Sequence, residues 1–400
     1  MENEKMKIWT KDFILITMTA FFVYLVFYLL MTTLTVYAME EFSVSNSHAG
    51  FVSSIFVIGA LASRLLIGKY IDHMSRKRLI FAGLSLYLIF MLAYFVVDNI
   101  YMLFLVRLLH GAAMGVSATT LATAIQDIIP SERRGEGTGY YTLSTILATA
   151  AGPFIGLLIT QYYSFTIVFV VCMVFSIICL IIPLFANFPD VNTNSEQLRT
   201  SKIPMIKGFF EIKALPISII AAFIGFAFVG ILTFLSSYSI ELNIVNASSF
   251  FFIVYTTFVL ISRPFTGRLL DVKGDNLVIY PALILFTIGL IILSQTEHGF
   301  TLLLSGALIG LGYGTLISSL QTIVIKVSPQ DRKGLATSTF FAFLDGGAGI
   351  SPLLTGFLVP IVGFRGLYFT LAIIVFIGLV LYYFLHGKQR TTKKLHSHAM

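Results

Sequence analysis

Charged residues are scarce in this chain. Of its 400 residues, 11% are Asp, Glu, Lys or Arg and 57% are hydrophobic, whereas roughly a quarter of a soluble globular protein is charged. Apolar runs of about 18 or more residues, the length of a transmembrane helix, recur along the sequence. This composition excludes an ordinary soluble domain and predicts a protein made largely of membrane-spanning helices.

Cysteine is also scarce, with two residues in the chain. Cys172 and Cys179 lie in one apolar run, whereas metal and redox sites favour closer spacing and polar neighbours. We therefore expect two core residues, no metal site and no cofactor. His396 and His398, in the basic C-terminal segment, are interpreted as tail composition.

The net charge of +7 is distributed unevenly. All Lys and Arg residues except Arg107 and Arg365 fall in, or beside, one alternate set of connections between apolar runs. Because positive residues accumulate on the cytoplasmic side of membrane proteins, we predict a multi-pass plasma-membrane protein with both termini in the cytoplasm. The same distribution argues against nucleic acid as a partner.

Twelve apolar segments predict an all-α membrane protein with twelve transmembrane helices. We expect the helices at 13–39, 48–68, 78–97, 100–128, 137–162, 165–185, 215–240, 247–267, 276–295, 300–327, 335–362 and 366–386. The domain boundaries follow as an N-terminal six-helix bundle at 1–185, a polar cytoplasmic linker at 186–214, a C-terminal six-helix bundle at 215–387 and a basic cytoplasmic tail at 388–400.

The two halves repeat one another in a single register. Ser63, Arg64, Gly68 and Asp72 recur 199 positions later as Ser262, Arg263, Gly267 and Asp271. The same offset relates Gly111 to Gly310, Gly115 to Gly314 and Pro153 to Pro352. A constant offset over this length indicates two homologous halves and therefore two pseudo-symmetric bundles.

This duplicated arrangement resembles the major facilitator superfamily of secondary transporters. Residues 63–78 are similar to the family's signature between helices 2 and 3, in which a glycine, an acid four residues later and a basic pair follow one another. Gly68, Asp72 and Arg76 with its basic neighbour Lys77 occupy these positions, whereas Ser75 stands where the family usually has a second glycine.

Two further segments carry the resemblance. Residues 105–115 are similar to the helix-4 signature, with Arg107 present and His110 in place of the commoner glutamine. Residues 151–156, Ala-Gly-Pro-Phe-Ile-Gly, resemble the Gly-Pro motif of helix 5 in proton-coupled drug and metabolite exporters. The resemblance therefore implies export coupled to protons.

Asp345 is the preferred candidate for the proton carrier. A charge inside the bilayer costs ~2.5–3.5 kcal/mol on insertion scales, so such a residue is a functional candidate by default. Asp345 lies about ten residues into its helix, on the order of 15 Å along an apolar core roughly 30 Å thick. A static ion pair, or a cap on backbone freed at Gly346 and Gly347, is the alternative.

Arg107 and His110 are the other candidates for proton coupling. Arginine stays charged at any accessible pH, so Arg107 could bias a nearby acid or hold an anionic group. His110 follows three residues later on the same helix face, and histidine changes charge near neutral pH. The resemblance implies that Arg107 faces the central cavity; packing roles are the alternative for both residues.

A cytoplasmic gate is expected at the end of helix 2. Arg76 between the carboxylates of Asp72 and Asp127 could form a charge-assisted network. The resemblance implies that this network, with Gly68 and with Asp271 in the second half, locks the cytoplasmic face and opens when an acid is protonated. A solvated loop that only sets topology is the alternative.

Gly152, Pro153, Gly156 and Pro352 form the predicted helix-kink motif. Proline removes a backbone donor and kinks a helix, whereas glycine permits close helix approach. We expect these residues to let helices 5 and 11 rock during alternating access, and simple packing is the competing interpretation.

The resemblance implies that helices 1, 4, 7 and 10 line a substrate cavity. Aromatic and Met side chains with few charges suit an apolar or amphipathic organic molecule. The candidates are Tyr24, Tyr28, Thr32, Met114, Ser117, Phe226, Phe234 and Tyr313. Packing or lipid contact is the alternative for any one of them.

The sequence thus predicts a monomeric proton-coupled exporter of a small drug-like or amphipathic molecule, and not an enzyme. The nearest alternative is export of an anionic metabolite or siderophore, with Arg107 and His110 as the anion clamp. Import of a sugar or amino acid by symport is third, because the Gly-Pro motif disfavours it. A non-transporting receptor or scaffold is the alternative of another class, and the short linker and tails disfavour it.

Overall fold

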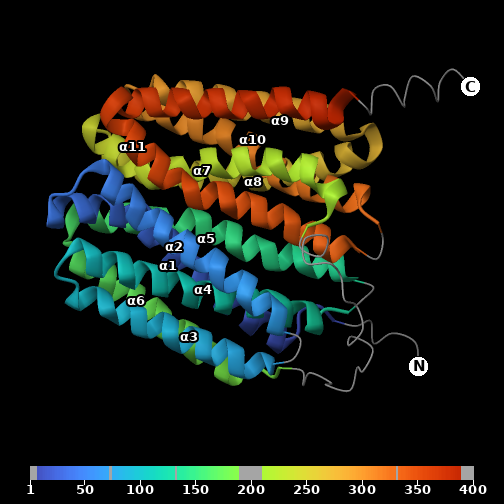
Figure 1. The fold of residues 1–400 in the computed structure, drawn as a ribbon, viewed down its shortest axis with the longest axis horizontal. Helices are drawn as coiled ribbons and strands as arrows, with labels where there is room; N and C mark the ends of the chain where they lie inside the picture. The colour runs from blue at the N-terminus through green and yellow to red at the C-terminus, as the bar shows by residue number, and fades with distance from the viewer. Residues whose placement is uncertain (1–6, 72–73, 131–132, 189–209, 330–331, 389–400) are drawn as a thin grey trace, which may run out of the picture. The chain divides into compact units, whose positions relative to one another are not determined.

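The computed structural model describes residues 7–71, 74–130, 133–188, 210–329 and 332–388. Every regular element in these ranges is helical (Figure 1). Contacts divide the chain into two compact units: unit 1 comprises residues 1–45 and 51–199, and unit 2 comprises residues 46–50 and 200–400.

The first six long helices lie in unit 1, except for the first residues of α2. They are α1 (Lys11–Phe42), α2 (Asn46–Tyr70), α3 (Arg76–Ala93), α4 (Ile100–Ile128), α5 (Arg134–Tyr162) and α6 (Phe165–Ile181). A short 3₁₀ turn, η2 (Tyr94–Val96), extends α3, and η4 (Ile182–Phe185) extends α6. Side chains begin two of the helices, because Thr10 accepts from the Phe13 amide at 3.2 Å and Asn99 from the Met102 amide at 2.9 Å.

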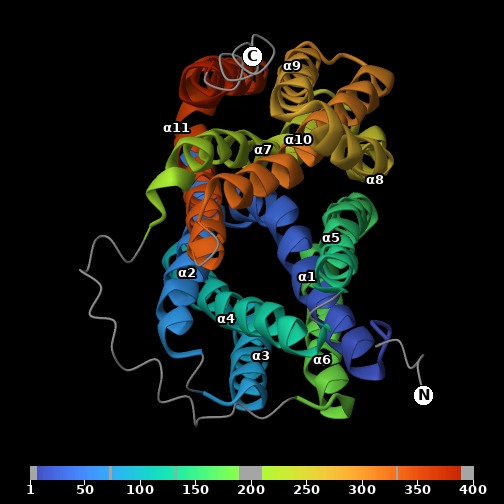
Figure 2. The same ribbon diagram turned by 90° about the vertical axis from the view of Figure 1, so that its right-hand side faces the viewer.

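Unit 2 holds the second set of helices (Figure 2). They are η6 (Ile212–Ala214), α7 (Leu215–Glu241), α8 (Val245–Lys273), α9 (Asp275–Ser294), α10 (Gly299–Val327), α11 (Lys333–Tyr382) and η8 (Tyr383–Gly387). α7 packs chiefly against α11, and α10 packs against both α8 and α9.

α11 accounts for two of the twelve predicted spans. It has 50 residues, and Gly363 within it has a non-helical conformation with φ 69° and ψ 177°. A continuous helix of that length would measure about 75 Å, far more than the roughly 30 Å of a hydrocarbon core. The chain doubles back within α11 (Figure 1), and positive φ favours glycine at the turn.

Eleven helices in the described ranges are long and apolar enough to cross a membrane, with α11 counted once. Because Gly363 divides α11 into two segments, the predicted fold class, an all-α membrane protein with twelve transmembrane helices, is confirmed.

The sequence repeat is also a repeat of helix packing. A Cβ at Gly111 of α4 would overlap the carbonyl oxygen of Phe56 in α2, and one at Gly310 of α10 would overlap that of Tyr255 in α8. Both members of the second pair lie 199 positions after those of the first. Glycine permits backbone contact at both crossings.

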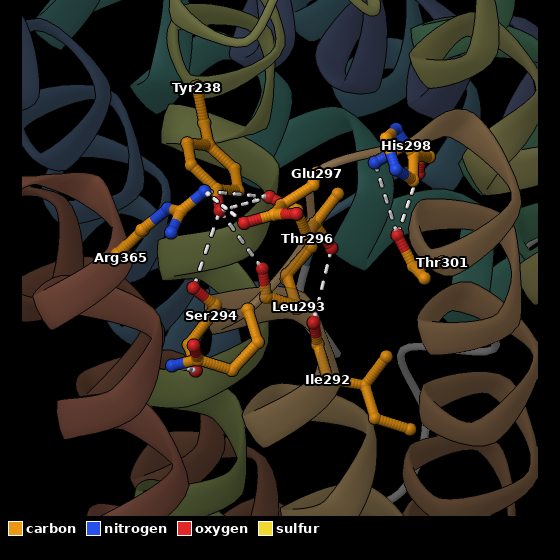
Figure 3. Close-up of polar contacts among 10 residues, drawn as sticks. Tyr238, Ile292, Leu293, Ser294, Thr296, Glu297, His298, Thr301 and Arg365 are labelled. Atoms are coloured by element: carbon orange, nitrogen blue, oxygen red, sulfur yellow. Dashed lines mark hydrogen bonds and ion pairs between the residues drawn. The ribbon is translucent and has the colours of Figure 1, made fainter.

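Polar contacts tie together one end of unit 2 (Figure 3). The buried Tyr238 of α7 donates to the carbonyl oxygen of Leu293 at 3.2 Å. Arg365 Nη2 lies 3.5 Å from the carbonyl oxygen of Thr296 and 3.6 Å from Glu297 Oε1. The connection between α9 and α10 is therefore joined to α7 and to the segment after Gly363.

Candidate functional site

Arg107 of α4 is completely buried inside unit 1. Its Nε donates to the carbonyl oxygen of Val52 at 3.0 Å, and its Nη1 lies 3.4 Å from the Tyr94 hydroxyl. The guanidinium carbon is 4.1 Å from the centroid of the Phe56 ring, a cation–π arrangement. Nη2 has no hydrogen-bond partner, and no carboxylate pairs with Arg107 in the described part of the chain.

His110 continues this polar chain within α4 and is also completely buried. Its Nδ1 lies 3.1 Å from the Tyr94 hydroxyl, and its ring centroid lies 4.3 Å from that of Tyr87. Its Nε2 has no hydrogen-bond partner. Arg107, Tyr94, His110 and Tyr87 are called the Arg107 cluster below.

The sequence prediction found two members of this cluster and missed both tyrosines. Three residues, 97–99, separate η2 from α4, and such a short connection makes consecutive helices antiparallel neighbours. The end of helix 3 must therefore lie beside the start of helix 4. This rule could have placed Tyr94 near Arg107, whereas the distant Tyr87 gave no comparable signal.

The cluster is sensitive to charge. A buried cation without a carboxylate is costly, and Tyr94 can accept a hydrogen bond from Arg107 while donating to Nδ1 of a neutral imidazole. A proton on His110 would place a second positive charge beside Arg107 and remove that acceptor. Protonation, or the arrival of an anion, would therefore change the energy of the whole cluster.

Asp345 is half-buried in α11. The residues around it contact α7: the Leu344 carbonyl oxygen lies 2.6 Å from a Cβ built on Gly225, and a Cβ on Gly347 would overlap the Ala222 carbonyl. Leu344 and Gly347 lie on one face of α11. Asp345 follows Leu344 directly and is therefore rotated by about 100° from it around the helix axis. Asp345 therefore starts from a different side of α11 than these two residues.

The structure brings two residues of the predicted gate together. Arg76 Nε lies 3.1 Å from Asp127 Oδ2, with the Arg76 side chain 7% exposed and that of Asp127 36% exposed. Arg76 Nη1 also donates to the Ile71 carbonyl oxygen. Asp72 lies outside the described residues, and so do the surroundings of Gly68 and the side chain of Asp271.

The gate pair has a reversed counterpart in unit 2. The positions 199 residues after Arg76 and Asp127 are Asp275 and Lys326. Asp275 is buried and pairs with His386 Nε2 at 2.9 Å. The second half therefore keeps charged residues at these positions with opposite signs.

A family model described as the Major Facilitator Superfamily matches residues 16–300 and again residues 245–399. The chain belongs to this superfamily. The resemblance predicted from the duplicated motifs is confirmed, and the protein is a membrane transporter and not an enzyme.

Relatives of this superfamily member include proteins named for export. It is 26% identical over 357 residues to an uncharacterized MFS-type transporter of Methanocaldococcus jannaschii, covering 87% of this chain and 92% of the relative. It is 26% identical to the multidrug resistance protein MdtG of Salmonella arizonae, covering 82% of each chain. It is 21% identical to the staphylopine export protein of Staphylococcus aureus, covering 86% of this chain and 88% of the relative.

Solved structures of the superfamily share the fold. A bacterial homologue of the human lysosomal transporter Spinster, in an inward-facing and unoccupied conformation, matches with a TM-score of 0.77 at 14% identity over 94% of this chain and 96% of that chain. The nucleoside transporter NupG matches with a TM-score of 0.74 at 13% identity over 93% of this chain and 99% of that chain.

The Gly-Pro motif of this transporter packs tightly in each half. A Cβ on Gly152 would lie 2.8 Å from Tyr28 Cβ of α1, and one on Gly156 would lie 2.9 Å from Thr33 Cγ2. α5 continues as a helix through Pro153. α11 likewise runs through Pro352, and the preceding Ser351 donates to the Phe226 carbonyl oxygen at 2.6 Å.

The predicted cavity residues fall into two groups. Tyr24, Tyr28, Phe226 and Tyr313 are half-buried, whereas Thr32, Met114, Ser117 and Phe234 are buried. Helix packing accounts for Ser117, whose hydroxyl lies 2.6 Å from a Cβ built on Gly83 of α3, and for Phe234, whose ring lies 6.2 Å from that of Phe364.

Cys172 and Cys179 are both buried free thiols, as expected for core residues. Among the described residues, no group of three or more His, Cys, Asp or Glu side chains could hold a metal ion.

Proposed function

We propose that this transporter is a proton-coupled exporter that moves a small drug-like or amphipathic molecule across the plasma membrane by alternating access. The observation that carries the proposal is the fully buried Arg107, which has no carboxylate partner among the described residues and lies in one polar chain with His110. Keeping such a charge in an apolar bundle is costly, so a role in transport is the default hypothesis for it. The relatives named for multidrug resistance and staphylopine export support the outward direction.

Asp345 and His110 are the proposed proton-binding groups. Asp345 is half-buried in a spanning helix, and a ligand shifts a conformational equilibrium only through different affinities for the two states. In the proposed cycle an entering proton favours one state and the departing substrate the other. Arg107 remains charged throughout and makes the cluster respond to the proton.

The remaining predicted residues have mechanical roles in this proposal. The Arg76–Asp127 pair closes the cytoplasmic side in one state and separates in the other. The close contact of Gly152 and Gly156 with α1 lets the two helices move together. We further propose that both termini lie in the cytoplasm and that the monomer is the transporting unit.

Inside-out membrane vesicles with an imposed proton gradient test this function. We expect the gradient to drive uptake of an amphipathic dye or of another efflux substrate, and Asp345→Asn to abolish this drive. Asp98→Asn is the matched control, because Asp98 is exposed beside the α4 N-terminus and accepts from Asn99 at 2.6 Å. Undiminished gradient-driven uptake in Asp345→Asn would remove this acid from the mechanism.

A further inference from the structure

Arg263 lies in the part of α8 that leads to the α8–α9 connection, as the last residue of the apolar span Val245–Arg263, and neither the predicted nor the proposed machinery uses it. Ile261 and Phe265, two residues to either side, are 51% and 72% exposed. Arg263 therefore lies roughly 160–200° around the helix from the outward face. Its side chain therefore starts from the interior side of α8, where it is half-buried.

The guanidinium of Arg263 has no carboxylate partner among the described residues. Its Nε is buried and makes no hydrogen bond, although the residue as a whole is half-buried. Thr256, two helical turns earlier on the same face, is 3% exposed, and its hydroxyl also lacks a partner. Buried polar groups normally have partners, so two on one face indicate a ligand.

Aromatic rings from three helices lie beside this face. The Phe228 ring of α7 stacks on Tyr313 of α10 with centroids 4.0 Å apart and planes 15° apart. The Tyr255 ring of α8 has its centroid 5.3 Å from that of Phe228, and Tyr255 directly precedes Thr256 in the chain. Phe228, Tyr255 and Tyr313 are called the aromatic stack below.

Unit 1 does not repeat this combination. The counterparts of the aromatic stack at the 199-residue offset are Leu29, Phe56 and Met114, and that of Thr256 is Val57. Arg64 corresponds to Arg263, so the arginine is common to both halves whereas its aromatic and hydroxyl surroundings belong to unit 2.

We propose that Arg263 and Thr256 bind the anionic group of the transported molecule and that the aromatic stack holds its flat apolar body. Guanidinium groups bind carboxylate or phosphate with two parallel hydrogen bonds, and aromatic rings favour planar partners. This rests on the proposed function and narrows its substrate to organic anions. An anionic lipid headgroup offers the same chemistry, so the test must separate a lipid from a free anion.

The test measures binding of radiolabelled naphthalene-2-carboxylate to the full-length protein in neutral phosphatidylcholine nanodiscs. Its uncharged analogue, naphthalene-2-carboxamide, is the competitor. Because hydrogen bonds to charged groups are the stronger class, we expect the carboxylate to bind about tenfold or more tightly than the amide. Arg263→Gln should abolish this preference, and Arg263→Lys should retain part of it because the charge remains without the planar fork.

Two adjacent threonines supply the matched control. Thr256→Val should lower carboxylate affinity about threefold through the loss of one hydrogen bond. Thr257→Val should leave it unchanged, because Thr257 is exposed and its hydroxyl already donates to the Ile253 carbonyl oxygen at 2.8 Å. If Arg263→Gln fails to fold, Arg263→Lys and Thr256→Val still test the site.

An unaltered carboxylate preference in Arg263→Gln, or no preference in the wild type, would overturn the proposal. Displacement of naphthoate by phosphatidylglycerol through Arg263 would assign the site to lipid and overturn the proposal equally.

Binding in nanodiscs requires no proton gradient, whereas transport does, so the two measurements separate the anion site from the proposed function. Arg263-dependent binding without proton-driven flux would therefore refute the proposed function alone, and flux without this binding would refute the anion site alone.

Discussion

Both units contain the same glycine crossing, between α2 and α4 in unit 1 and between α8 and α10 in unit 2, but the side chains around it differ. In unit 1 the buried Arg107 donates to the Val52 carbonyl beside the Gly111 crossing. The counterparts of Arg107 and Val52 in unit 2 are Gly306 and Phe251. Two Phe251 ring carbons lie 3.1 Å from a Cβ built on Gly306, so a phenyl ring lies against the position where unit 1 has its arginine.

His110 shows the same difference, because its counterpart is Ile309 and that of Tyr94 is Leu293. Ile309 and Leu293 are completely buried. Unit 2 thus forms the equivalent helix crossing with apolar side chains at these positions, so the crossing itself does not require a charged cluster. The comparison therefore supports a role in transport, and not in folding, for the charges of unit 1.

The largest expected effect is that of Arg107→Leu on transport. We expect gradient-driven uptake in vesicles to fall about 100-fold or more, as for loss of an electrostatic group of an active site. The thermal midpoint should stay equal or rise, because replacing buried charges with apolar side chains is often neutral or stabilising. Arg365→Leu, at an ion pair that is partly exposed, is the control. Unfolding of Arg107→Leu would show that the two units differ in what their folds require.

Gly111→Ala and Gly310→Ala should destabilise the protein to a similar extent. Each added Cβ would overlap a backbone carbonyl of the adjoining helix, and overpacking costs about 1–3 kcal/mol. The measurement is thermal or denaturant unfolding in detergent. Gly139→Ala is the control, because nothing lies within 4 Å of its added Cβ. Strong destabilisation by one substitution alone would contradict the repeated packing.

His110→Ile, which introduces the residue of unit 2, should reduce proton-driven uptake about tenfold and flatten its pH dependence. The reason is that histidine can bind a proton whereas isoleucine cannot, and an unperturbed imidazole changes charge between about pH 5 and 8. A tenfold loss is smaller than the ~100- to 10,000-fold typical of proton-transfer groups, because Asp345 remains. Uptake measured across this range at constant gradient gives the result. An unchanged pH profile would leave Asp345 as the proposed proton group.

Tyr94→Phe should have a smaller effect on transport and a measurable one on stability. Loss of the Tyr94 hydroxyl removes the hydrogen-bond partner of Arg107 Nη1 and of His110 Nδ1. The free energy of unfolding should fall by about 1–3 kcal/mol as a result. Unfolding and uptake are measured together, and Tyr238→Phe in unit 2 is the comparison because its hydroxyl also bonds inside the protein. A neutral Tyr94→Phe would show that Tyr94 does not hold the cluster together.

The smallest effect is expected at the end of unit 2. Glu297→Gln removes the partner of Arg365, but the side chains of both residues are about half exposed or more, at 65% and 47%. Exposed ion pairs contribute about 0.2–1 kcal/mol. Unfolding should therefore change little and uptake should remain at the wild-type level; a large loss of uptake would give this end of unit 2 an unexpected role.

Helix positions were predictable because long apolar runs and polar caps determine them. The predicted segment 100–128 is α4 with the same bounds, and the Arg76–Asp127 contact followed from the signature at the end of helix 2. The Gly306–Phe251 contact was not predictable, because an apolar residue in a spanning helix carries no sign of its partner. Arg263 was visible as a repeated residue, but its inward direction and the missing partner required coordinates.

The glycine crossings have a consequence for motion. Where backbone touches backbone, sliding one helix along the other by less than a turn would bring a residue with a Cβ against the partner's carbonyl group. The pairs α2–α4 and α8–α10 should therefore each travel as one rigid rod, and the α1–α5 contact at Gly152 argues the same for that pair. In the proposed alternating access, rearrangement should therefore occur at the seams between such rods, where side chains and not backbone atoms are in contact.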